Sequence, residues 1–288
     1  MSLSLLRALR RVVLVCIVAS ALLVGAFANR AAAGTQASAF ASAAASGSAG
    51  ERTTRTVDSG ASAHRGGEAR GHYPSAPITL HVDNVDVMAF PPVRAQQAES
   101  KPLSVIYLHG ARGRAVNGCP WFRGGASELG WLVCPEAIEQ QPDGSWSWGA
   151  DVFKQAPIVE GALRAARANG ASSEPGIAVG FSQGSYVALD LVRAHLASFR
   201  GLVLLGAELH PNAQRLKDAG IVRVSLGAGQ MDHLAYASLR DEAIRLSSEG
   251  VETRFFDLGR VGHTYAVEDT SVLDDAIAFA AGGAGVGN

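Results

Sequence analysis

The sequence is poor in cysteine and in charge, and it lacks the common metal-binding and nucleotide-binding motifs. It has three cysteines and 18% charged residues among 288 positions. There is no Cys/His cluster and no HExxH pair, so nothing predicts a metal or any other cofactor. The Walker lysine and the dinucleotide glycine spacing are missing as well. A net charge of −1, with no basic cluster in the part expected to fold, argues against nucleic acid as a partner.

Apolar residues are plentiful, at 48% of the chain, so a sizeable core can form in one large domain. The first 33 residues are typical of an export signal. Arg7, Arg10 and Arg11 precede the apolar run Val12–Ala28, which ends in the A-x-A sequence of a cleavage site. We therefore expect a periplasmic or secreted protein. The alternative is an uncleaved anchor, and only then would the membrane be a partner.

Composition changes sharply after the signal. Residues 34–77 are mostly Ala, Ser, Gly, Thr and Arg, which cannot bury enough apolar surface to offset chain entropy. This stretch is expected to be a disordered tether, followed by a folded domain over 78–288. Cys119 and Cys134 lie in that domain, and export to an oxidising compartment favours a disulfide between them over two buried thiols.

Short apolar runs alternate with helical patterns along the domain, which predicts an α/β fold with a mainly parallel sheet and helices on both faces. The expected elements are a hairpin over Ile78–Val87, strands at Ser104–Leu108, Trp131–Cys134, Ile177–Gly180, Gly201–Leu205, Ile221–Leu226 and Thr253–Leu258, and helices at Ile158–Asn169, Gln183–Ser198, Leu234–Glu249 and Ser271–Ala280. Right-handed crossovers place all parallel strand ends at one edge, where ligands bind.

Gly180-Phe181-Ser182-Gln183-Gly184 carries the chemistry. This G-x-S-x-G sequence lies directly between an expected strand and an expected helix. The turn there is so tight that the residues two positions before and after the serine must lack side chains. The serine hydroxyl projects from the sheet edge. Ser182 is therefore the predicted nucleophile.

The nucleophile needs a base and an acid. His263 follows the strand Thr253–Leu258 on a glycine-containing loop, and Asp232 follows the preceding strand, which gives the chain order Ser, Asp, His. Rival acids are Asp257 and Glu208. His233 is a rival base only if its loop turns inward.

Acyl transfer also needs hydrogen-bond donors for the oxyanion. The expected donors are the backbone N–H groups of Gln183 and of Ala111, which follows His109-Gly110 after a strand. His109 is expected to fix this loop through side-chain hydrogen bonds.

Arg112, Trp146, Trp148 and His210 are candidates for a substrate pocket, since they lie in loops at the same edge. The two tryptophans are equally compatible with a role in the core.

Tyr107-Leu108-His109-Gly110, Gly180–Gly184, the spacing from Gly227 to Asp232, and Gly262-His263 resemble the carboxylesterase, phospholipase and thioesterase branch of the α/β hydrolases. The resemblance covers about Ile78 to Ala280. It implies an α/β-hydrolase fold with a small or absent lid, the triad Ser182, Asp232 and His263, and the donors Ala111 and Gln183.

The sequence thus predicts an exported serine hydrolase that cleaves a small or lipid-like carboxylic ester or thioester. The alternatives are a serine peptidase or an acyltransferase with the same triad, and a binding module without catalysis. An acceptor alcohol or a peptide substrate would reveal the first two, and a misplaced triad member the third.

Overall fold

The computed structural model describes residues 76–82, 85–93 and 101–282. The expected signal (1–33) and all but the last two residues of the expected tether (34–77) lie outside these residues. Among the described residues no helix has the length and apolarity to span a membrane.

The core of the fold is an eight-stranded sheet in the order β1-β2-β4-β3-β7-β8-β9-β10. Its strands are β1 Ile78–Val82, β2 Val85–Phe90, β3 Leu103–Leu108, β4 Gly130–Cys134, β7 Gly176–Phe181, β8 Phe199–Leu205, β9 Arg223–Ala228 and β10 Glu252–Asp257. The first hairpin is antiparallel and β2 pairs antiparallel with β4, whereas the pairs from β4 through β10 are parallel. A second sheet pairs β5 Glu139–Gln140 with β6 Trp146–Ser147.

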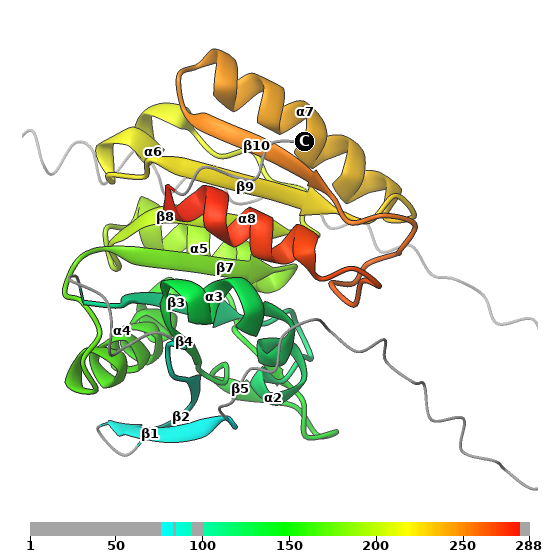
Figure 1. Cartoon of the computed structure of the whole chain (residues 1–288). Coiled ribbons are helices and arrows are strands. Elements are labelled where there is room, and N and C mark those ends of the chain that lie inside the picture. The colour runs from blue at the N-terminus through cyan, green and yellow to red at the C-terminus, as the bar shows by residue number, and fades with distance from the viewer. Residues whose placement is uncertain (1–75, 83–84, 94–100, 283–288) are drawn as a thin grey trace, which may run out of the picture. The chain divides into compact units, whose positions relative to one another are not determined.

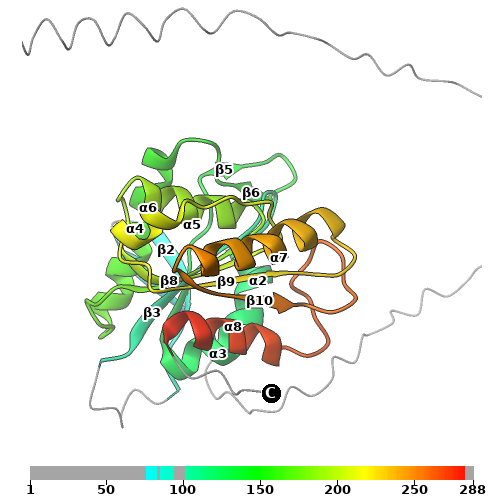
Figure 2. The same cartoon turned by 90° about the horizontal axis from the view of Figure 1, so that it is seen from above.

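Helices cover both faces of the sheet, as the sequence predicts. They are α2 Ala115–Gly118, the 3-10 helix η1 Cys119–Phe122, α3 Arg123–Leu129, α4 Val152–Ala168, α5 Gln183–Arg193, α6 Ala213–Asp218, α7 His233–Ser248 and α8 Ser271–Ala281. One buried cluster joins α4, α5, α6 and α7 to the sheet, and the other joins η1, α3 and α8 to its opposite face. Figures 1 and 2 show α3 and α8 together on one side. Because both faces are covered, central strands such as β3 and β7 are continuous apolar runs.

Helix α5 is shorter than expected and ends at Arg193. His195 has φ 52°, and the N–H of Leu196 donates to the carbonyl of Leu191 over 2.9 Å. This is a Schellman end with histidine in the place that glycine usually takes, so the sequence gives no stop signal.

Helix α4 begins six residues earlier than expected. Pro157 lies inside it, and the side chain of Asp151 caps its start by accepting a hydrogen bond from the Phe153 N–H. Proline inside a helical pattern argues for a helix boundary, which is why the first turns are missed from sequence. The connection between β8 and β9 holds the short helix α6 and no larger insertion, which agrees with a small lid.

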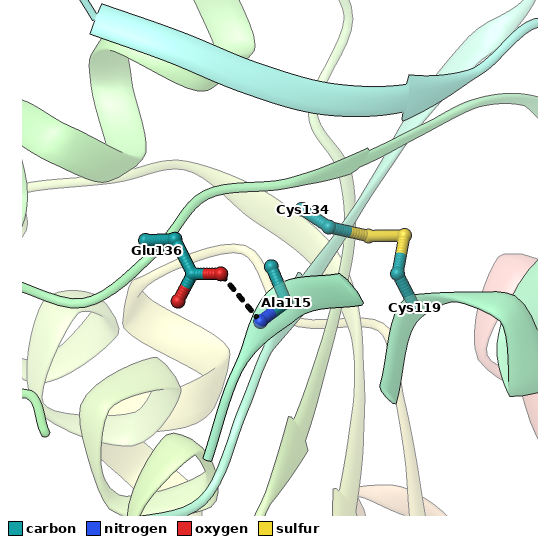
Figure 3. The surroundings of a disulfide bond; sticks show 4 residues. All are labelled: Ala115, Cys119, Cys134 and Glu136. Carbon is teal, nitrogen blue, oxygen red and sulfur yellow. Dashed lines mark hydrogen bonds between the residues drawn. A yellow bond between two sulfur atoms is a disulfide. The ribbon is translucent and has the colours of Figure 1, made fainter. Parts of the chain in front are cut away.

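Cys119 in η1 and Cys134 at the end of β4 have their sulfur atoms at bonding distance, with Cα atoms 6.0 Å apart (Figure 3). Nearby, Glu136 accepts a hydrogen bond from the Ala115 N–H at the start of α2 over 2.9 Å. Both contacts tie the α2–η1 segment to the end of β4. A disulfide at this position stays a prediction, and its pairing is the one expected.

Asp274 in the first turn of α8 is half-buried against α3, and this burial raises its pKa to about 6, with a smaller contribution from nearby acids such as Asp275. A carboxyl group whose pKa is higher in the folded than in the unfolded protein makes the folded state less stable as the pH rises from the unfolded-state pKa through the folded-state pKa. Asp274→Asn keeps the acceptor for the Gly125 N–H and removes the charge. We expect it to raise the free energy of unfolding by about 1 to 2 kcal/mol at neutral pH, and by much less near about pH 4.

Denaturant unfolding of Asp274→Asn at the two pH values measures this effect, and Asp241→Asn, at an exposed carboxylate on α7, serves as the control. A gain that is equal at both pH values, or equal in the two variants, would contradict the assignment.

Candidate active site

Ser182 lies in a strained turn between β7 and α5. Its backbone has φ 51° and ψ −117°, which a residue with a side chain adopts only at an energetic cost. A Cβ on Gly184 would come within 1.9 Å of the Leu108 carbonyl oxygen, and one on Gly180 within 2.5 Å of the Gly184 carbonyl oxygen. Both glycines of the G-x-S-x-G sequence are therefore required by close backbone contacts.

His263 bridges Ser182 and Asp232. Its Nε2 is 3.0 Å from Ser182 Oγ, and its Nδ1 is 2.6 Å from Asp232 Oδ2. The carboxylate can only accept at neutral pH, so Nδ1 carries the proton and Nε2 is free to accept from the serine hydroxyl. The Asp232 side chain is 16% exposed and that of His263 is 52% exposed, which leaves the base open to a substrate. The structure thus brings together the three residues that the sequence singled out.

These three residues come from three strand ends on one edge. Ser182 follows β7, Asp232 follows β9 and His263 lies on the loop after β10, and the strands concerned run parallel. The acid and base loops are joined by backbone hydrogen bonds, including Met231 N–H to the Val261 carbonyl over 3.0 Å. Their relative placement is therefore fixed by the sheet and by direct contact.

The rival acid Asp257 has a different set of partners. Its carboxylate accepts from Gln230 Nε2 and Tyr236 Oη, each over 2.9 Å, and from the Gly259 N–H over 2.8 Å. Burial acts to raise its pKa, but these hydrogen bonds outweigh burial and lower it. Asp257 therefore supports the loop that leads to His263, and the carboxylate that contacts the imidazole belongs to Asp232.

The other rivals lie on the surface. Glu208 is exposed, and its backbone carbonyl accepts from Tyr186 Oη over 2.8 Å. His233 is exposed at the start of α7. His210, a pocket candidate, has a side chain that is 80% exposed and lies 3.4 Å from Glu242 Oε2. In the described part of the chain, none of these side chains has a recorded hydrogen bond to Ser182 or His263.

The expected oxyanion donors lie beside the nucleophile. A Cβ on Gly110 would be 3.2 Å from Ser182 Cβ, which places the backbone of the loop after β3 next to the serine. Gln183 is the first residue of α5, where helix geometry leaves the N–H without an intrahelical acceptor. Neither the Ala111 N–H nor the Gln183 N–H has a recorded acceptor among the described residues.

His109 fixes the loop from within. It is 1% exposed; its Nδ1 is 2.8 Å from the Gly110 carbonyl oxygen, and its Nε2 is 3.2 Å from the Ala137 nitrogen. A neutral imidazole with the proton on Nδ1 satisfies both contacts. The buried ring therefore has the loop-fixing contacts expected of it.

The pocket candidates differ in burial, from the protein core to the surface. Trp148 is fully buried in the core, so of the two roles left open by the sequence it has the one in the core and does not form a pocket wall. Trp146 is half-buried and packs against the same core. Arg112 is exposed, has φ 56° and forms an ion pair with Asp143.

Two aromatic residues near the base were missed from sequence. The Phe181 ring centroid is 5.0 Å from that of His263 and 4.7 Å from that of Tyr265. Trp121 extends this group, with its ring 6.4 Å from Tyr265. Phe181 adjoins the nucleophile and Tyr265 follows His263 by two residues, so adjacency to the triad was an available signal. Among the described residues, no group of three or more His, Cys, Asp or Glu side chains is placed to hold a metal ion.

No protein-family model matches the sequence, and neither does any of the curated proteins compared with it. Solved structures do match. An uncharacterized protein from Bacillus cereus ATCC 10987 has 19% identity over 65% of this chain, with a TM-score of 0.54; this chain covers 62% of that protein, less than two thirds of its length. The Bacillus cereus carboxylesterase has 13% identity over 69% of this chain and 94% of its own, with a TM-score of 0.50.

A fluorophosphonate-binding serine hydrolase of Staphylococcus aureus has 18% identity over 71% of this chain and 96% of its own, also with a TM-score of 0.50. The mainly parallel sheet, the helices on both faces and these neighbours together show that the chain has the α/β-hydrolase fold.

Proposed function

We propose that this protein is a serine hydrolase that cleaves carboxylic esters or thioesters through an acyl-enzyme on Ser182. The observation that carries the proposal is the hydrogen-bonded chain from Ser182 Oγ through His263 to Asp232, with distances of 3.0 and 2.6 Å. The carboxylesterase and the serine hydrolase among the structural neighbours are in keeping with this activity.

In the first half-reaction, Ser182 Oγ attacks the carbonyl carbon of the ester while His263 Nε2 takes the hydroxyl proton. Asp232 holds the imidazole and stabilises its positive charge. The oxyanion receives hydrogen bonds from the N–H groups of Ala111 and Gln183. Collapse of the intermediate breaks the bond to the leaving alcohol or thiol, which takes the proton from His263.

Water completes the cycle. It attacks the acyl-enzyme carbonyl as His263 takes one of its protons, and the second tetrahedral intermediate then releases the carboxylic acid and returns the proton to Ser182 Oγ. The exposed side of His263 gives water access to the base. The two half-reactions together return Ser182 and His263 to their starting state, so no cofactor is needed in this scheme.

Export is also part of the proposal. It rests on Arg7, Arg10, Arg11 and the apolar run that follows them. The close pair Cys119 and Cys134 would suit an oxidising compartment.

Labelling with a fluorophosphonate probe, followed by mapping of the modified residue, tests the site. We expect one modification, at Ser182, because only a serine activated by a base attacks the phosphorus. His263→Ala should abolish labelling. His81→Ala, an exposed histidine on β1, should not change it. Well-folded protein that stays unlabelled, or labelling that survives His263→Ala, would overturn the proposal and favour a binding module.

A further inference from the structure

Trp148 forms hydrogen bonds to both segments that carry the proposed oxyanion donors. It follows β6 and is 0% exposed. Its indole Nε1–H donates to the backbone carbonyl of His109 over 2.9 Å, at the base of the loop that carries Ala111. Its own backbone N–H donates to Oε1 of Gln183 over 2.9 Å. One buried residue thus binds the loop that holds one donor and the side chain of the residue that provides the other.

The rest of this segment holds the loop at its far end. The Trp146 N–H donates to the Gly113 carbonyl over 2.9 Å, and the Arg112 N–H donates to Ser147 Oγ over 3.1 Å. The loop over residues 109–113 is therefore bound at its first residue and at its last two.

Trp148 is itself held in place by α4 and by the ring of His109. Gln155 of α4 is 3% exposed, and its Nε2 donates to the Trp148 carbonyl over 3.2 Å. The rings of Trp148 and His109 are 5.5 Å apart. The core therefore fixes Trp148, and Trp148 in turn fixes the loop.

We propose that Trp148 is a positioning residue that sets the geometry of the oxyanion hole. The inference rests on the proposed function, since it concerns the donors of that same site. Donors stabilise a tetrahedral intermediate only when their N–H groups point at the oxyanion within hydrogen-bonding distance. Ala111 lies in a connection between β3 and α2 rather than in a helix or strand, so contacts with neighbouring segments help to set the direction of its N–H, beside the contacts within the loop. Trp148 provides one such contact to the loop, at the His109 carbonyl, and a second contact to the side chain of Gln183.

A simple space-filling role would predict something different. Any well-packed aromatic ring at position 148 would then serve, and its loss would lower stability without a selective effect on catalysis. Trp131 allows a direct comparison, because it is a second buried tryptophan of the same core. It lies in β4 opposite Ser104 at the start of β3, the end of that strand remote from the loop over residues 109–113.

Trp148→Phe removes the indole donor and keeps an aromatic ring, and Trp131→Phe is the matched control. For a p-nitrophenyl ester we expect Trp148→Phe to lower kcat about tenfold with little change in KM, because the donors act on the transition state. The affinity for a trifluoromethyl ketone, which forms an oxyanion on the serine, should fall by a similar factor. Trp131→Phe should change neither value.

Hydrogen exchange separates this inference from the proposed function. Amides over residues 109–113 should exchange faster in Trp148→Phe than in the full-length wild type or in Trp131→Phe, whether or not the protein hydrolyses esters. Wild-type protein that neither hydrolyses esters nor reacts with the fluorophosphonate would contradict the proposed function alone. Unchanged exchange in Trp148→Phe, or a fall in kcat matched by Trp131→Phe, would overturn the role of Trp148.

Ser147 offers a second route if Trp148→Phe folds poorly. Ser147→Ala removes the acceptor of the Arg112 N–H, and we expect a kcat about threefold lower with faster exchange in the loop. Ser147→Thr keeps the Oγ and should restore both. A Ser147→Ala enzyme with wild-type kcat and wild-type exchange would contradict the idea that this segment positions the hole.

Discussion

Ser182→Ala is expected to lower kcat/KM for a p-nitrophenyl ester by about 10⁶-fold, and the protein should remain folded. The loss is large because alanine cannot form the acyl-enzyme, so only the binding site and the oxyanion donors remain. Alanine carries the same Cβ as serine, so the strained turn at φ 51° is neither relieved nor worsened. Initial rates and the circular dichroism spectrum measure the two parts of the prediction.

The control is Ser173→Ala, an exposed serine before β7, which should retain full activity. Hydrolysis that persists in Ser182→Ala at more than a trace would show that another group performs the chemistry.

Asp232→Asn is expected to lower kcat by about 10⁴-fold near neutral pH. The carboxylate lies 2.6 Å from His263 Nδ1 and is largely shielded from water. An amide can donate to Nδ1 and so stabilise the tautomer with its proton on Nε2, which cannot accept from Ser182. It also carries no charge to stabilise the imidazolium. Steady-state kinetics, with binding of a substrate analogue to confirm an intact site, measure the effect.

The variant Asp257→Asn distinguishes between the two candidates for the triad acid, Asp232 and Asp257. Asp257 lies on the same edge, but its partners are Gln230, Tyr236 and Gly259. The hydrogen bonds to its ionised form lower its pKa, so its charge contributes stability at neutral pH that is lost as pH falls through the folded-state pKa. We expect this variant to lose stability and less than about tenfold in kcat. The reverse order of the two variants would make Asp257 the acid.

The succession of the main strands and helices along the chain and the three candidate triad residues were predictable because each depends on local pattern. Short apolar runs such as Ser104–Leu108 are typical of strands buried on both faces, and parallel strands bring their ends to one edge. Gly180 and Gly184 mark the turn at Ser182 because contacts of 2.5 Å or less leave no room for a Cβ.

Other boundaries depended on contacts that a local pattern does not contain. The end of α5 uses His195 in a left-handed conformation, held by hydrogen bonds to the last turn. The start of α4 extends before Pro157, because Asp151 caps it and the core covers it.

The sequence by itself determined the fold class and the candidates for nucleophile, acid and base, since composition, periodicity and chain order encode these directly. Only the tertiary structure decided between rivals. It gave His263 a carboxylate partner in Asp232 and gave Asp257 other partners. It also decided between the two roles left open for Trp148 by placing it in the core, where its indole N–H donates to the His109 carbonyl. Each of these outcomes depends on hydrogen bonds between segments that are distant in the chain, and such pairings form only when the sheet brings the loops together.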